Sequence, residues 1–123
     1  MRLWVLVPVA LVLLAGCGGP APPPRAGGPE LSGGGALFRY RNSDAKKVCL
    51  VGDFNDWSPD TDPMTDENGD GEWTLFYPLS PGRYAYKFVV DGRSWIPDPT
   101  NPESEPDGFD GRNSVLVIPD TAP

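Results

Sequence analysis

The sequence predicts an all-β sandwich, and three observations lead to that prediction. Between residues 36 and 119, short runs rich in β-branched and aromatic residues alternate with clusters of Pro, Gly, Asn and Asp. No stretch of this region repeats its apolar residues at helical spacing. In the run 82–92, every second side chain falls on one face, as in a strand that covers a core: Tyr84, Tyr86, Phe88 and Val90. A chain of 123 residues has room for one such domain.

The N-terminal segment is typical of a secretory signal. Arg2 precedes an apolar run over residues 3–14, which is shorter than the roughly 20 residues needed to span a bilayer. The run ends in Leu14-Ala15-Gly16-Cys17, which resembles the bacterial lipobox. That resemblance implies cleavage before the cysteine and attachment of lipid, palmitate included, to Cys17. We therefore expect residues 1–16 to be a signal peptide and the mature chain to be a membrane-anchored lipoprotein.

The chain has two cysteines, so a disulfide between Cys17 and Cys49 is the alternative to lipidation. We favour lipidation because Cys17 stands where cleavage is expected, whereas Cys49 lies inside an apolar run and is expected to be buried. Gly18 follows the cysteine where an aspartate would favour retention. By resemblance to lipoprotein sorting in Gram-negative cells, this implies the outer membrane or the periplasmic face of the cell envelope.

Residues 17–35 are expected to combine the lipidated Cys17 with a flexible linker. The stretch GGPAPPPRAGGPELSGGG over residues 18–35 is dominated by Pro and Gly and has almost nothing to bury. Fully extended, it would hold a domain on the order of 50 Å from a membrane. The predicted domain then covers residues 36–119, and residues 120–123 are expected to be a tail.

Strands are expected within the domain at residues 36–42, 46–53, 72–79, 82–92, 94–98 and 113–119. In the third of these, Trp73 alternates with Leu75 and Tyr77, so its side chain is expected to face the core. The loop VGDFNDWSPD, by contrast, places Trp57 among turn-forming polar residues. From the residues alone, Trp57 is either a plug that caps one end of the sandwich or a platform that contacts a ligand.

The charge distribution argues against nucleic acid as a partner. The formal net charge is −7, and no Lys or Arg occurs between Lys47 and Arg83. The acidic residues of that interval are Asp53, Asp56, Asp60, Asp62, Asp66, Glu67, Asp70 and Glu72. Such a surface repels phosphate, so nucleic acid and anionic lipid headgroups are poor partners. We interpret most of the run as a solvated loop face.

Neither a metal site nor catalysis is expected. DENGDG at residues 66–71 matches the first half of a calcium loop, but Tyr77 occupies the twelfth position, where a glutamate is needed. We interpret the stretch as a tight turn before a strand. The chain has no histidine, which excludes Ser-His and Cys-His arrangements, and its acids lie in loops with no implied cleft. The protein is therefore expected to be a non-enzyme without a cofactor.

Three stretches together resemble a known family. They are VCLVGDFNDWSP, then DENGDGEWTLFYPLSPGRYAYKFVVDGRSWIPDP, and finally GRNSVLVI. In this order they are similar to the glycogen-binding and isoamylase N-terminal type of early-set domain, carbohydrate-binding module family 48. The resemblance covers nearly all of residues 36–119 and implies an immunoglobulin-like sandwich that binds α-1,4-linked glucan. Because members are often attached to glucan-processing enzymes, it also implies such an enzyme as a possible partner.

The resemblance further implies which residues contact sugar. The stacking tryptophans of the family fall on Trp57 and Trp95, and its hydroxyl-binding lysine falls on Lys87. A sugar-binding asparagine falls on Arg112, with Asn113 matching the residue beside it. These residue types suit a pyranose, which presents an apolar face to an aromatic ring and hydroxyl groups to polar donors.

A further apolar contact of the family has Phe109 as a rough candidate. The whole sequence thus predicts a lipid-anchored, extracytoplasmic, non-catalytic domain for glycogen-like or starch-like α-glucan. The alternative is an envelope protein–protein interaction domain that keeps the early-set fold and binds no sugar. Exposure of Trp57 and Trp95 on one surface favours the first hypothesis, and burial of both favours the second.

Overall fold

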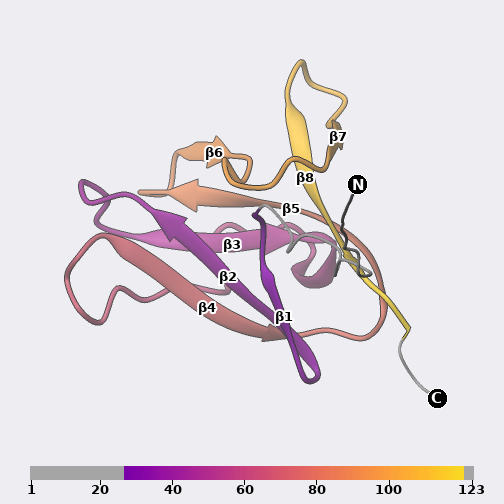
Figure 1. Cartoon of the computed structure of the whole chain (residues 1–123). Coiled ribbons are helices and arrows are strands. Elements are labelled where there is room, and N and C mark those ends of the chain that lie inside the picture. The colour runs from indigo at the N-terminus through magenta and orange to yellow at the C-terminus, as the bar shows by residue number, and fades with distance from the viewer. Residues whose placement is uncertain (1–26, 121–123) are drawn as a thin grey trace, which may run out of the picture.

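Two antiparallel sheets pack face to face in the computed structural model, which describes residues 27–120 (Figure 1). The strands are β1 (Glu30–Ser32), β2 (Gly35–Arg41), β3 (Val48–Gly52), β4 (Glu72–Pro78), β5 (Gly82–Val90), β6 (Ser94–Ile96), β7 (Ser104–Pro106) and β8 (Arg112–Ile118), with one short 3-10 turn, η2 (Asp53–Asn55). The three-strand sheet has the order β1-β2-β4, and the five-strand sheet has the order β3-β5-β8-β7, with β6 also paired to β5. The predicted all-β sandwich is confirmed. The expected signal peptide and Cys17, the expected site of lipidation, lie outside the described residues.

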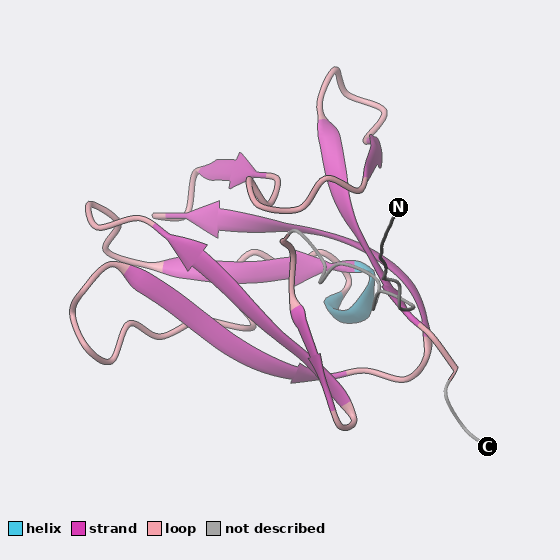
Figure 2. Cartoon of the chain, viewed as in Figure 1, coloured by secondary structure: helices cyan, strands magenta, loops and turns pink. Residues whose placement is uncertain are grey.

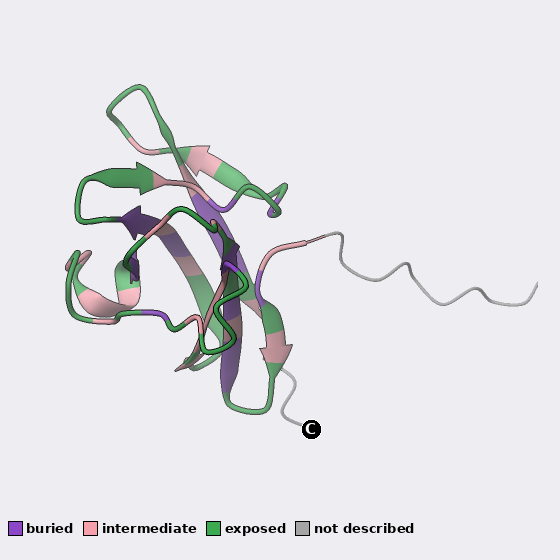
Figure 3. Cartoon of the chain, turned by 90° about the vertical axis from the view of Figure 1, so that its left-hand side faces the viewer, coloured by how far each residue is buried: buried purple, intermediate pink, exposed green. Residues whose placement is uncertain are grey.

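The core lies between the sheets, where buried residues follow the facing strands while most loops are exposed (Figure 3). Aromatic rings join the two layers. The ring of Phe38 on β2 meets Tyr86 on β5 edge to face, with centroids 5.0 Å apart. Tyr40 lies at the same centroid distance from Phe88, one inward position further along β5. The alternation predicted for the run 82–92 therefore supplies the inner face of the five-strand sheet.

Strands and loops account for nearly all of the described chain (Figure 2). The expected strands are present with ends that differ by a few residues, and two short strands were not expected. β1 falls within the expected linker. Its backbone pairs with β2, and Leu31 packs against the core. β7 pairs with the start of β8 through only Ser104, Glu105 and Pro106. The described part of the chain holds no helix with the length and hydrophobicity that crossing a bilayer requires.

The long connection between β3 and β4 covers the open edge of β3. The backbone N–H of Leu50 donates to the carbonyl of Asp62 at 3.0 Å, and the N–H of Met64 donates to the carbonyl of Val48 at 2.7 Å. Met64 is buried in the core. The carboxylate of Asp66 accepts the N–H of Gly71 at 2.9 Å, which closes the predicted turn before β4. An edge covered in this way is protected from pairing with other chains.

Trp73 and Cys49 lie as the sequence indicated. Trp73 packs against the core from β4, half-buried, and its indole N–H donates to the carbonyl of Asn42 at 3.0 Å. Cys49 is buried in β3, and burial raises the pKa of its thiol. Both residues therefore act in packing.

A buried polar network anchors the segment that joins β6 to β7. The carboxylate of Asp98 accepts the hydroxyl of Tyr86 at 2.7 Å, and the backbone N–H of Asp98 donates to Ser114 Oγ at 2.7 Å. The side chain of Asn101 donates to the carbonyl of Val115 at 2.9 Å. Buried polar groups of this kind are stable only when they are paired. The network fixes β6 and the β7–β8 hairpin against the sheet.

Candidate functional site

A cavity of about 430 Å³ lies on the outer face of the five-strand sheet. Its lining comes from the loop after β3, from β5 and β6, and from the β7–β8 hairpin: Asp53, Trp57, Ala85, Lys87, Trp95, Glu105, Asp107, Phe109 and Asn113. Ala85 and Lys87 alternate along β5 with residues of the core, so their side chains point outward. The fold thus brings together four of the residues predicted to contact sugar: Trp57, Lys87, Trp95 and Asn113.

The polar residues around Trp57 build the loop that carries it. Asn55 Oδ1 accepts the backbone N–H of Gly52 at 3.0 Å, and Asn55 Nδ2 donates to the carbonyl of Leu50 at 2.9 Å. The ring of Phe54 turns inward and lies 4.7 Å from Tyr77 between centroids. Gly52 is required at its position, because an added Cβ would meet the carbonyl oxygen of Ala85 at 2.6 Å. The start of the loop is therefore fixed to the end of β3 and to the core.

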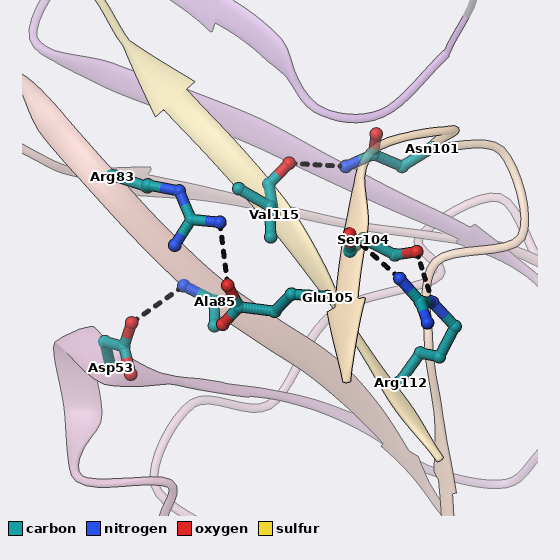
Figure 4. A network of polar contacts seen from close by, with 8 residues as sticks. All are labelled: Asp53, Arg83, Ala85, Asn101, Ser104, Glu105, Arg112 and Val115. Carbon is teal, nitrogen blue, oxygen red and sulfur yellow. Dashed lines mark hydrogen bonds and ion pairs between the residues drawn. The ribbon is translucent and has the colours of Figure 1, made fainter. Parts of the chain in front are cut away.

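Trp57 has a strained backbone and a fixed side chain. Its φ is 57°, in the left-handed region that bulky residues rarely adopt. Its indole N–H donates to Asp53 Oδ1 at 3.1 Å. Asp53 Oδ2 accepts the backbone N–H of Ala85 at 2.8 Å, where the ladder between β3 and β5 has ended (Figure 4). One carboxylate thus ties the half-buried indole to the central strand of the sheet.

Trp95 is the more exposed of the two indoles, with 44% of its surface accessible. It stands on β6 opposite Val89 of β5, and Val89 is only 1% exposed. Paired residues on neighbouring strands share a face of the sheet. Trp95 therefore rests partly on the strand and leaves the remainder of its ring open to the cavity.

Lys87 and Asp107 both line the cavity and form an ion pair, with Nζ and Oδ2 2.8 Å apart. The two side chains are only 12% and 10% exposed. Asp107 Oδ1 also accepts the backbone N–H groups of Phe109 at 2.7 Å and Gly111 at 3.0 Å. The hydrogen bond from Lys87, followed by the backbone donors, lowers the pKa of Asp107 to about 2. The pair fixes the hairpin loop over β5, while the other N–H donors of Lys87 are available to a ligand.

Asn113 lines the cavity, whereas Arg112 does not. The two residues are neighbours on β8, and successive side chains of a strand point to opposite faces. Arg112 donates through Nε to Ser104 Oγ at 2.7 Å, and it lies on the other side of β7 from Glu105 (Figure 4). The structure thus places Asn113, rather than the aligned Arg112, beside Trp57 and Trp95.

Phe109 belongs to the loop at the tip of the β7–β8 hairpin, which projects beyond the body of the sandwich (Figure 1). Phe109 is 88% exposed and lines the cavity. The fold therefore adds a third aromatic ring to the cavity on an element separate from those that carry the two indoles.

Sequence reasoning missed the carboxylates of the cavity. Asp53, Glu105 and Asp107 all line it, and Glu105 also pairs with Arg83 at 2.7 Å. Asp107-Gly108 carries a local turn signal, but its pairing with Lys87 joins residues distant in sequence. Together with the ammonium of Lys87 and the amide of Asn113, these carboxylates supply both hydrogen-bond donors and acceptors beside the aromatic rings of the cavity. That combination matches a sugar ring, whose hydroxyl groups donate and accept at the rim of an apolar face.

Comparison with known proteins agrees with this geometry. The family model described as the glycogen recognition site of AMP-activated protein kinase matches residues 36–121. Protein PTST homolog 2, chloroplastic, of Arabidopsis thaliana is 37% identical over 76 residues, which are 62% of this chain and 13% of that protein. The 1,4-alpha-glucan branching enzyme GlgB of Bacillus caldolyticus is 38% identical over 69 residues, or 51% of this chain and 10% of the enzyme.

The corresponding branching enzyme of Mycobacterium ulcerans is 41% identical over 62 residues, half of this chain and 8% of the enzyme. The chain therefore spans only a small part of the length of each relative, and the likeness is confined to one domain. The family match runs from the second residue of β2 through β8 and includes every residue that lines the cavity, whereas β1 lies outside it. This chain belongs to the family of glycogen-recognition domains, carbohydrate-binding module family 48.

Proposed function

We propose that the cavity binds α-1,4-linked glucan of the glycogen or starch type. The observation that carries the proposal is the convergence of Trp57 and Trp95 on one cavity, with Lys87 between them on β5. Two rings held by separate elements can stack on successive parts of one chain, and planar rings lose little conformational entropy on binding. The joint exposure of both rings to one cavity supports sugar binding over a domain that only pairs with protein.

The polar groups would fix the sugar by its hydroxyls. Lys87 donates, the carboxylates of Asp107 and Glu105 accept, and the amide of Asn113 does both. Because Asp107 already holds Lys87, the ammonium is positioned before the ligand arrives. A preorganised site of this kind loses less free energy to ordering when it binds.

The proposed activity is binding without catalysis. The family is one of carbohydrate-binding modules, and in the branching enzymes the corresponding domain is a small part of a much longer chain. We further propose that Cys17 is lipidated and that the domain is displayed outside the cytoplasm on the cell envelope. The lipobox-like Leu14-Ala15-Gly16-Cys17 supports this proposal. In that place the domain would hold glucan near the cell, either alone or for a glucan-processing enzyme.

Sedimentation of the purified protein with insoluble starch tests the binding function, with cellulose as the control. We expect the protein to sediment with starch and to stay in solution with cellulose. Titration with maltoheptaose, followed by tryptophan fluorescence, then gives a Kd of roughly 1 mM to 1 μM. Failure to bind starch and maltoheptaose would refute the proposal.

A further inference from the structure

A second cavity, of about 620 Å³, lies where β3 begins and the β5–β6 turn ends. Three of its lining side chains are exposed cations, Lys46, Lys47 and Arg93. We call this feature the basic cavity. It stands out in a chain with a formal net charge of −7, because acids outnumber cations along the sequence.

The three cations lack the partners that the other cations have. Elsewhere in residues 27–120, cationic side chains pair with acids or bind a neighbour: Arg39 with Glu30 and Glu72, Arg41 with Glu72, Arg83 with Glu105, Lys87 with Asp107, and Arg112 with Ser104. Within the same residues, no ion pair includes Lys46, Lys47 or Arg93. A cleft lined mainly by one sign of charge raises the local concentration of counter-ions.

Asp91, the acidic residue that lines the basic cavity, fixes the backbone there. Asp91 Oδ1 accepts the backbone N–H of Lys46 at 2.8 Å and that of Lys47 at 3.0 Å. Asp91 and Gly92 both have positive φ, as a tight turn between β5 and β6 requires. The carboxylate thus pins the start of β3 to this turn, and the three cationic side chains extend from a fixed backbone. Even with Asp91 counted, positive charge exceeds negative charge in the lining.

We propose that the basic cavity is an anion-binding site for a phosphate monoester. Two ammonium groups and a guanidinium offer point charges and a planar fork of donors to a compact dianion, and the hydroxyl of Ser94 adds a further donor. A neutral glucan carries no charge that could pair with these three cations, whereas a phosphate monoester does. Phosphate carried by a soluble sugar and phosphate carried by a lipid headgroup share this chemistry.

The basic cavity is distinct from the glucan cavity although β6 borders both. Ser94 lines the basic cavity and Trp95 lines the glucan cavity. Adjacent residues of a strand point to opposite faces, so the two cavities lie on either side of β6. Occupation of one therefore does not exclude occupation of the other, and the phosphate proposal stands independently of glucan binding.

Titration of the isotope-labelled protein with glucose 6-phosphate at low ionic strength, followed by amide NMR shifts, tests the proposal. We expect saturable shifts at residues 46–47 and 90–94, with a Kd on the order of 1 mM, and none with glucose. Arg93→Gln should weaken binding at least about tenfold, since a charge-assisted hydrogen bond is lost. Arg41→Gln removes the same charge from an exposed residue that does not line the basic cavity and should leave the Kd unchanged.

Lys46→Gln serves as a second variant if Arg93→Gln does not fold. Sedimentation with vesicles containing phosphatidic acid separates the two sources of phosphate. Binding to the vesicles together with binding of glucose 6-phosphate would support the site and name a lipid as one source. Non-saturable shifts, equal weakening in Arg41→Gln, or binding to vesicles without binding of the soluble ester would each overturn it.

Discussion

Replacement of Trp95 by Ala should remove a measurable part of the glucan affinity. Trp95 is 44% exposed, and a sugar ring stacked on that surface would cover roughly 80 Å² of an indole. At about 25 cal/mol per Å² of apolar surface, the contact contributes about 2 kcal/mol. We therefore expect Trp95→Ala to weaken maltoheptaose binding about thirtyfold, since about 1.4 kcal/mol corresponds to a factor of ten.

The same substitution affects folding, and the assay must separate the two effects. Trp95 also covers Val89 on β5, so the variant should lose about 2 kcal/mol of unfolding free energy. A domain of this size has an unfolding free energy of about 5 to 15 kcal/mol, so the variant should stay folded at 25 °C. Thermal melting followed by circular dichroism should show a lower Tm with an intact transition. The titration is then made well below that Tm.

Phe76→Ala is the matched control for Trp95→Ala. Phe76 is also 44% exposed, but it stands on β4 in the three-strand sheet and does not line the glucan cavity. Phe76→Ala should lower the Tm to a similar extent and leave the Kd for maltoheptaose unchanged. Unchanged affinity in Trp95→Ala, or equal weakening in Phe76→Ala, would refute the stacking argument.

Three further outcomes are expected. The hydrogen bond from Lys87 and the backbone donors hold the pKa of Asp107 at about 2, so the stabilisation they give is complete above the ordinary pKa of 3.8 and is lost as the pH falls towards 2. The Tm difference between the protein and Asp107→Asn should therefore be constant above about pH 5 and should shrink in acid. Asp53→Asn should weaken maltoheptaose binding about fivefold, because the charge-assisted bond that orients Trp57 becomes a neutral one, and calorimetric titration would measure this. Cys17→Ser should yield a precursor that is unprocessed or released from membranes, as seen by fractionation and mass spectrometry.

The strands were predictable because their signals are local. The alternation in β5 and the turn residues on each side of β4 follow from side-chain periodicity. β1 and β7 were not predictable, because each is only three residues long and depends on backbone pairing with another strand. Residues 30–32 contain one apolar residue, Leu31, and so short a run cannot show the alternation that predicts a strand.

The aromatic part of the candidate site was predictable, and much of the polar part was not. Trp57 and Trp95 are conspicuous in the sequence as large rings in polar surroundings. Arg112 and Asn113 differ by one position, and only the register of β8 against β7 decides which of them faces the cavity. The pairing of Lys87 with Asp107 depends on the hairpin folding back over β5. Contacts between distant residues of this kind leave no local pattern.

The strained loop explains why Trp57 is surrounded by polar residues. A left-handed φ at a bulky residue costs about 1 to 3 kcal/mol and persists only where neighbouring contacts fix it. Here the contacts are the hydrogen bonds of Asn55 to the end of β3 and the bond from the indole to Asp53. A plug would gain its stability from burial and would need no such frame, whereas Trp57 is only half-buried. The frame holds the ring in place before a ligand binds, and an aromatic platform that is already ordered loses less entropy on binding.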